Sequence, residues 1–154
     1  MGTASRHFDW SEFACKCANP HCSGKETHVD RLLVVGLEEL HELAATRLTS
    51  AIRILISWND GKGGSGCRCR EHDMAVRHND STGQHAEWRA ADIRMERRPP
   101  YSYNDGAWVP VHPTYVAQVA EQCPVWHDGK GGIGIYDSWV HLDVRTGPGA
   151  RWRG

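Results

Sequence analysis

Residues 27–48 read THVDRLLVVGLEELHELAATRL, and this stretch decides the class of fold. Its apolar residues recur every three or four positions, which is the spacing of one helical face. They are Val29, Leu32, Leu33, Leu37, Leu40, Leu43, Ala44 and Leu48. Thr27 is the expected N-cap, with Asp30 at the position where a capping box has Glu or Gln. We therefore predict one long helix whose apolar stripe packs into the core.

The segments around this helix alternate between strand and helix patterns. Short apolar and β-branched runs predict strands, whereas three- and four-residue periodicity predicts helices. The expected strands are 51–56, 89–95 and one or two within 131–144, and the further helices are 9–13, 71–78 and 114–123. Residues 59–66 form a glycine-rich loop without a phosphate-binding motif, and 97–113 is expected to be loop. The predicted class is α+β, a small antiparallel sheet with flanking helices.

Length and composition favour one soluble globular domain spanning residues 1–154. The chain is 40% hydrophobic and 24% charged, values typical of such domains. A net charge of −1 gives no electrostatic reason to expect binding to nucleic acid or to an anionic membrane. The N-terminus lacks the apolar region of a secretory signal, and no apolar run is long enough to span a bilayer. We expect a monomer without stable membrane association.

Two short segments carry candidate metal ligands. They read HAEWRAAD at residues 85–92 and VHLDVR at 140–145. His85, Asp92 and His141 supply two imidazoles and a carboxylate, a ligand set typical of a catalytic zinc ion with one open position. If Asp92 lies on a strand after a loop with His85, and His141 lies on the adjacent strand, the three converge on one ion. This pattern predicts a zinc site.

Six cysteines leave two interpretations open. Cys15, Cys17 and Cys22 cluster near the start, while Cys67 and Cys69 lie in mid-chain. One interpretation is a disulfide between the N-terminal cluster and Cys67 or Cys69, as in an exported protein. The other is a second, structural zinc held by the Cys-x-Cys-x4-Cys cluster, although its spacing is not that of a standard zinc finger.

Four sequence blocks occur in the order found in a known family. They are FDWSEFACKC (8–17), SGCRCREHD (65–73), GQHAEWRAAD (83–92) and GGIGIY (131–136) with VHLDVR (140–145). Together they resemble the family of zinc D-Ala-D-Ala carboxypeptidases and L-alanyl-D-glutamate endopeptidases. Its wider superfamily includes lysostaphin-like endopeptidases and the hedgehog signalling domain. The resemblance implies a hedgehog/D-Ala-D-Ala-peptidase-like fold.

The resemblance also implies roles for particular residues. His85, Asp92 and His141 match the zinc ligands, and Arg68 matches the arginine that holds a substrate carboxylate in related enzymes. An arginine fork suits that task because it donates two parallel hydrogen bonds. The chain departs from the motifs at three residues, where Gly83 replaces Ser, Trp88 replaces Gly and Cys67 replaces Tyr, and at 59–64, which resembles an insertion before the arginine motif. These departures bear on the choice of substrate and remove no metal ligand.

Hydrolysis also needs a carboxylate that moves a proton. Many relatives place it three residues before the last histidine, where this chain has Ser138. Asp143 shares a strand face with His141 by alternation, and it is the favoured candidate because the branch of the family that the ending resembles carries Asp there. Its alternative role is to orient a zinc ligand. Asp137 is the second candidate and needs a bend in the chain to reach the site.

We therefore expect a zinc metallopeptidase that cuts stem peptides of bacterial peptidoglycan, as an endopeptidase or a D-Ala-D-Ala carboxypeptidase. The absence of a signal peptide suggests an endolysin made in the host cytoplasm that reaches the wall after holin-type release. The alternative is a non-catalytic, zinc-stabilised module of the hedgehog type that binds the cell wall or a protein.

Overall fold

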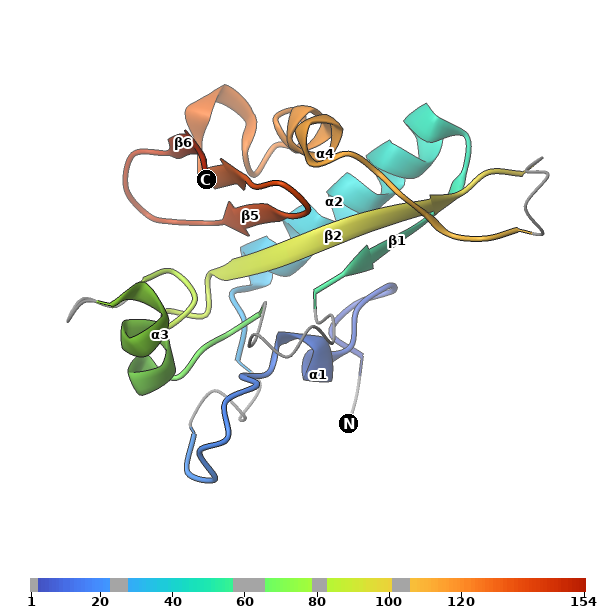
Figure 1. Ribbon diagram of the computed structural model, residues 1–154. Coiled ribbons are helices and arrows are strands. Elements are labelled where there is room, and N and C mark those ends of the chain that lie inside the picture. The colour runs from blue at the N-terminus through green and yellow to red at the C-terminus, as the bar shows by residue number, and fades with distance from the viewer. Residues whose placement is uncertain (1–2, 23–27, 57–65, 79–82, 101–105) are drawn as a thin grey trace.

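The computed structural model describes residues 3–22, 28–56, 66–78, 83–100 and 106–154 (Figure 1). Within these residues, six strands form one mixed sheet with the order β1-β2-β5-β4-β6, and β3 pairs with β2 beside this path. The strands are β1 (Ala51–Leu55), β2 (Ala90–Arg98), β3 (Val109–Pro110), β4 (Gly132–Ile135), β5 (Val140–Asp143) and β6 (Ala150–Arg153). All pairings are antiparallel except that of β4 with β6. The predicted α+β class is confirmed.

Four α-helices accompany the sheet in the described residues, namely α1 (Trp10–Phe13), α2 (Arg31–Leu48), α3 (Arg70–Arg77) and α4 (Pro113–Ala120). A short 3-10 turn, η2 (His127–Gly129), precedes β4. Helices α2 and α4 contact each other and the sheet, whereas α1 and α3 lie on the opposite side of β2 in the view of Figure 1. No helix among the described residues has both the length and the apolarity required to cross a bilayer.

Helix α2 provides the largest apolar surface of the core. Its buried residues are Leu33, Val34, Gly36, Leu37, Leu40 and Ala44. The expected inclusion of Leu32 is wrong, since that side chain is 58% exposed. Asp30 is the N-cap and accepts a hydrogen bond from the Leu32 backbone N–H at 2.9 Å, while the predicted cap Thr27 lies outside the described residues. Thr49 ends the helix in the left-handed conformation, with φ 45°.

The sheet is larger than the sequence pattern predicts. Strand β2 extends to Arg98, and β3 lies within the predicted loop 97–113, so that expectation is wrong at both ends. The backbone N–H of Val111 donates to the Met95 carbonyl at 2.9 Å, which holds this return segment against β2. Strand β6 was not predicted; its pattern of half-buried and exposed residues alternates, but it spans only four positions. The segment 131–144 forms two strands, which is one of the two predicted forms.

Candidate metal centre

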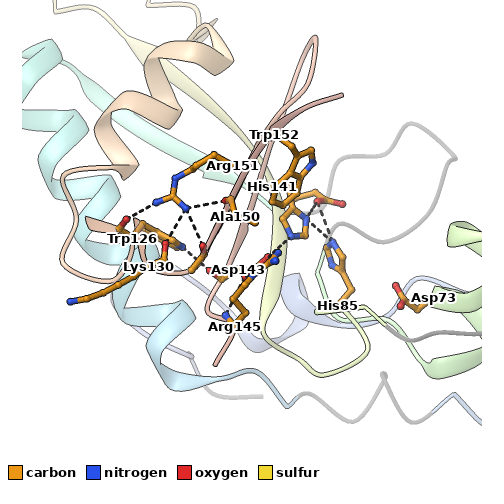
Figure 2. Close-up of polar contacts among 12 residues, drawn as sticks. Asp73, His85, Trp126, Lys130, His141, Asp143, Arg145, Ala150, Arg151 and Trp152 are labelled. Atoms are coloured by element: carbon orange, nitrogen blue, oxygen red, sulfur yellow. Dashed lines mark hydrogen bonds and ion pairs between the residues drawn. The ribbon is translucent and has the colours of Figure 1, made fainter. Parts of the chain in front are cut away.

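Three potential metal ligands meet between β2, β5 and the turn before β2. His85 Nε2 lies 3.2 Å from Asp92 Oδ1 and 3.2 Å from His141 Nδ1, and His141 Nδ1 lies 2.9 Å from Asp92 Oδ1. All three side chains are buried. Figure 2 shows the imidazoles of His85 and His141 pointing toward one another. The predicted set of residues is therefore brought together.

The register of the sheet explains this convergence. Asp92 and His141 are direct partners in the antiparallel pairing of β2 with β5, so their side chains project on the same face. His85 reaches them from a turn whose backbone is held by hydrogen bonds from Ala86 N–H and Glu87 N–H to the Gly83 carbonyl, at 3.0 and 3.3 Å. A shift of one residue in this register would move His141 to the opposite face.

The distances between the donor atoms fit a zinc ion. With zinc about 2.0–2.1 Å from each nitrogen or oxygen donor, a tetrahedral site places the donors about 3.3 Å apart. The three separations of 2.9–3.2 Å are close to that value. Three protein ligands leave one tetrahedral position, as in catalytic zinc sites. The donor set therefore fits zinc with one open position.

Each histidine is oriented through its other ring nitrogen. His85 Nδ1 lies 2.7 Å from the Gly66 carbonyl, and His141 Nε2 lies 3.1 Å from Asp143 Oδ2. A carbonyl or carboxylate on the far nitrogen fixes the ring and leaves the near nitrogen as a metal ligand, which is a recurrent feature of zinc sites. Both His85 and His141 have such a partner.

Asp143 lies on the side of His141 that faces away from the other two donors (Figure 2). Its side chain is fully buried, and Arg145 Nε donates to Oδ1 at 2.8 Å. The Trp126 indole N–H donates to the Asp143 backbone carbonyl at 2.9 Å. Asp143 thus has the geometry of a residue that orients His141. Asp137, the other predicted acid, is exposed in the turn between β4 and β5.

The charges of the site follow from these contacts. Burial raises the pKa of Asp92, but His85 and His141 outweigh this effect and hold it well below its usual range. Burial also raises the pKa of Asp143, but the hydrogen bonds from Arg145 and His141 outweigh this effect and lower it. Both carboxyl groups are therefore carboxylates at neutral pH, the form that binds a cation or accepts a hydrogen bond.

Arg68 lies at the edge of this centre and connects two carboxylates. It donates to Asp92 Oδ2 at 3.1 Å, the oxygen that does not face the histidines, and to Asp73 Oδ1 at 3.4 Å. Asp73 is fully buried and also accepts the Gly83 backbone N–H at 2.5 Å. Arg68 is thus in contact with Asp92, one of the three predicted ligands.

An aromatic group beside His141 was not predicted. The ring centroid of Trp152 lies 5.2 Å from that of His141, and its indole N–H donates to the Tyr136 hydroxyl at 3.0 Å. Tyr136 stacks on Trp139 with centroids 3.7 Å apart. The signal available in the sequence was the alternation within ARWR (150–153), which brings Trp152 to the sheet face that carries His141.

Trp88 has a backbone conformation that is unusual for a large side chain. Its φ is 60°, in the left-handed region that glycine adopts without steric cost. The motif that the sequence resembles has glycine at this position.

Two further groups of potential ligands occur in the described residues. Cys15, Cys17, Cys22 and Cys69 form one, and His7, His41 and Glu42 form a more exposed one. All six cysteines of the chain are free in the structure. The predicted disulfide between the N-terminal cluster and Cys67 or Cys69 is thus not formed, although Cys69 does meet the cluster.

Comparison of the chain with protein-family models, curated proteins and solved structures finds no match. The site geometry and the sequence blocks are therefore the basis for any functional assignment.

Proposed function

We propose that this protein is a zinc-dependent peptidase that hydrolyses peptide bonds in the stem peptides of bacterial peptidoglycan. The observation that carries the proposal is the convergence of His85 Nε2, Asp92 Oδ1 and His141 Nδ1 within 3.2 Å of one another. Two histidines and one carboxylate, each histidine oriented from behind, are the ligand type of hydrolytic zinc centres.

A zinc ion held there supplies a nucleophile at neutral pH and polarises the scissile carbonyl. Asp143 keeps the His141 ring in the tautomer that presents Nδ1 to the ion, and Arg145 keeps Asp143 in place. Arg68 neutralises the second oxygen of Asp92. In the proposal Arg68 also attracts a substrate carboxylate, since a peptide stem ends in one and guanidinium binds carboxylates well.

The choice of substrate rests on the four sequence blocks and on the fold that they imply, a hedgehog/D-Ala-D-Ala-peptidase-like one. Trp88 supports this resemblance, because its left-handed φ is the conformation expected where the motif has glycine. An endolysin-like role, with holin-type release to the wall, is the biological setting that we propose. The bond that is cut lies either within the stem or before its terminal D-Ala.

The test is digestion of purified peptidoglycan by the zinc-loaded protein, analysed by mass spectrometry. We expect new stem-peptide fragments, none from the His141→Ala variant, and none from a chelated sample until zinc is restored. His127→Ala is the matched control, since this histidine is exposed and is not grouped with the three donors. Intact muropeptides after treatment with protein shown to contain zinc at this centre would refute the proposal.

The second candidate is a non-catalytic, zinc-stabilised binding module. One observation favours it: among the described residues, Asp92 is the only carboxylate grouped with the two histidine donors, and Asp143 is already bound by Arg145. Sedimentation of the zinc-loaded protein with insoluble peptidoglycan, without release of fragments, is the result expected of such a module.

A further inference from the structure

Four cysteines converge at a place separate from the histidine centre. Cys15, Cys17 and Cys22 follow α1, and Cys69 is the N-cap of α3. Their sulfur atoms all lie within 4.8 Å of one another. We propose that these four thiolates hold a second, structural zinc ion. The site is independent of the peptidase proposal.

The spacing of the sulfurs agrees with tetrahedral coordination. With zinc about 2.3 Å from each sulfur, the sulfurs of a tetrahedral site are about 3.8 Å apart. Cys17 Sγ and Cys69 Sγ are separated by 3.7 Å. The four ligands would complete the coordination sphere, which is the arrangement of structural rather than catalytic zinc.

The cluster is buried but has little apolar surface of its own. Cys15, Cys22 and Cys69 are 3%, 5% and 3% exposed, and they form a cluster apart from the main core, with Cys17 packed against it. Four sulfurs bury too little apolar area to hold two chain segments together by the hydrophobic effect. A metal ion supplies that missing stabilisation, as it does in small zinc domains.

The surroundings of the sulfurs suit a negatively charged metal centre. The backbone N–H of Cys69 donates to Cys15 Sγ at 3.4 Å, and His72 Nδ1 lies 3.2 Å from the same sulfur. Zinc with four thiolates has a net charge of −2, and such donors offset it. Lys16 and Arg70 stand next to the ligands in the sequence and add positive charge.

A backbone hydrogen bond also joins the two chain segments that carry these cysteines. The Cys67 backbone N–H donates to the Phe13 carbonyl at 2.6 Å. Gly66 makes this approach possible, since a Cβ there would lie 2.6 Å from Phe13 Cα. Zinc would then cross-link residues 15–22 to Cys69 and so fix the start of α3.

The test is native mass spectrometry of the intact chain produced with zinc. We expect two zinc ions in the unaltered protein and one in His141→Ala. Cys22→Ser should lose one zinc, whereas Cys123→Ser should retain both, because Cys123 is equally buried but bonds to the Val119 carbonyl in α4. Cobalt substitution of His141→Ala should give the sulfur-to-cobalt charge-transfer absorption of a thiolate site.

Two results would overturn the proposal. One is a His141→Ala protein without bound metal, whose mass shows four free thiols or two disulfides at these cysteines. The other is a cobalt spectrum without sulfur-to-cobalt charge transfer. Both use protein with all four cysteines, so a folding failure of Cys22→Ser does not affect them. These experiments measure bound metal and the cobalt spectrum, and none of them measures peptidase activity. Either proposal can therefore fail without refuting the other.

Discussion

The Asp143 side chain orients the imidazole ring of His141. Its carboxylate lies on the far nitrogen of His141 and is held by Arg145. Alternation along a strand correctly predicts that Asp143 and His141 share a face. It does not predict which nitrogen of the ring Asp143 contacts, since that depends on the rotamer and on Arg145, which lies beyond the end of the strand.

We predict that Asp143→Asn weakens zinc binding by about 10–100-fold, the usual effect of losing a partner behind a ligating histidine. Competition with a chromophoric chelator measures this affinity. Asp137→Asn is the control and should bind zinc as the unaltered protein does, because Asp137 is exposed and outside the donor group. Equal affinities of the two variants would contradict the orienting role.

The Asp137→Asn variant also tests whether Asp137 transfers the proton during hydrolysis. Loss of hydrolysis by zinc-loaded Asp137→Asn would give that task to Asp137. Undiminished hydrolysis by this variant would exclude Asp137 from that task.

At the scale of elements, the long helix and the main strands were predictable because their patterns are strong. Helix α2 has a repeating apolar face, and in β2 and β5 apolar residues alternate with polar ones, as in DIRM (92–95) and VHLD (140–143). Strands β3 and β6 were missed for a physical reason. They are two and four residues long, and three of their six residues are Pro110, Arg151 and Arg153, so pairing with β2 and β4 decides their conformation.

Helix α2 packs against Trp126 at Gly36. A Cβ at Gly36 would lie 2.7 Å from the indole ring, which is fully buried. We predict that Gly36→Ala lowers the free energy of unfolding, since overpacking costs about 1–3 kcal/mol and the better helix propensity of Ala returns about 1 kcal/mol. Urea denaturation measures the difference. Leu32→Ala, on the exposed side of the same helix, should change stability less.

The N-terminal segment contacts α2 through ionisable side chains, since His7 bonds to Glu38 and stacks on His41. The His41 side chain bonds to the Ile52 carbonyl through Nε2 at 3.0 Å, and its Nδ1 is buried without a hydrogen-bond partner. Burial lowers the pKa of His41. Burial raises the pKa of Glu38, but the hydrogen bonds from His7 favour the carboxylate, and the pKa is lowered on balance.

Both shifts predict loss of stability in acid. A group whose pKa is lower in the folded state takes up protons on unfolding, so its contribution is complete above the unfolded pKa and falls as the pH drops below it. For His41 the decrease begins near pH 6.5. Thermal unfolding between pH 8 and pH 5 should show it. His41→Gln should reduce the slope, whereas His127→Gln, at an exposed site, should not.

At the scale of the whole molecule, binding of zinc to the histidine centre should stabilise the fold, because its ligands come from a turn and two strands that unfolding separates. Free zinc at 100 times the Kd adds about 2.7 kcal/mol. For a domain of this size, that corresponds to a rise in Tm of about 5–10 °C. Calorimetry of protein with and without zinc at the histidine centre measures it. An equal rise in His141→Ala would show that the stabilising zinc binds elsewhere.

The segment Gly66–Cys69 supports both groups of ligands. The Gly66 carbonyl orients His85, the Arg68 backbone N–H donates to the His85 carbonyl at 3.1 Å, and Cys69 belongs to the thiol cluster. Oxidation of the cysteines would displace the same few residues that hold His85 in position. We therefore expect peroxide treatment to weaken zinc binding at the histidine centre, although none of its ligands contains an oxidisable sulfur.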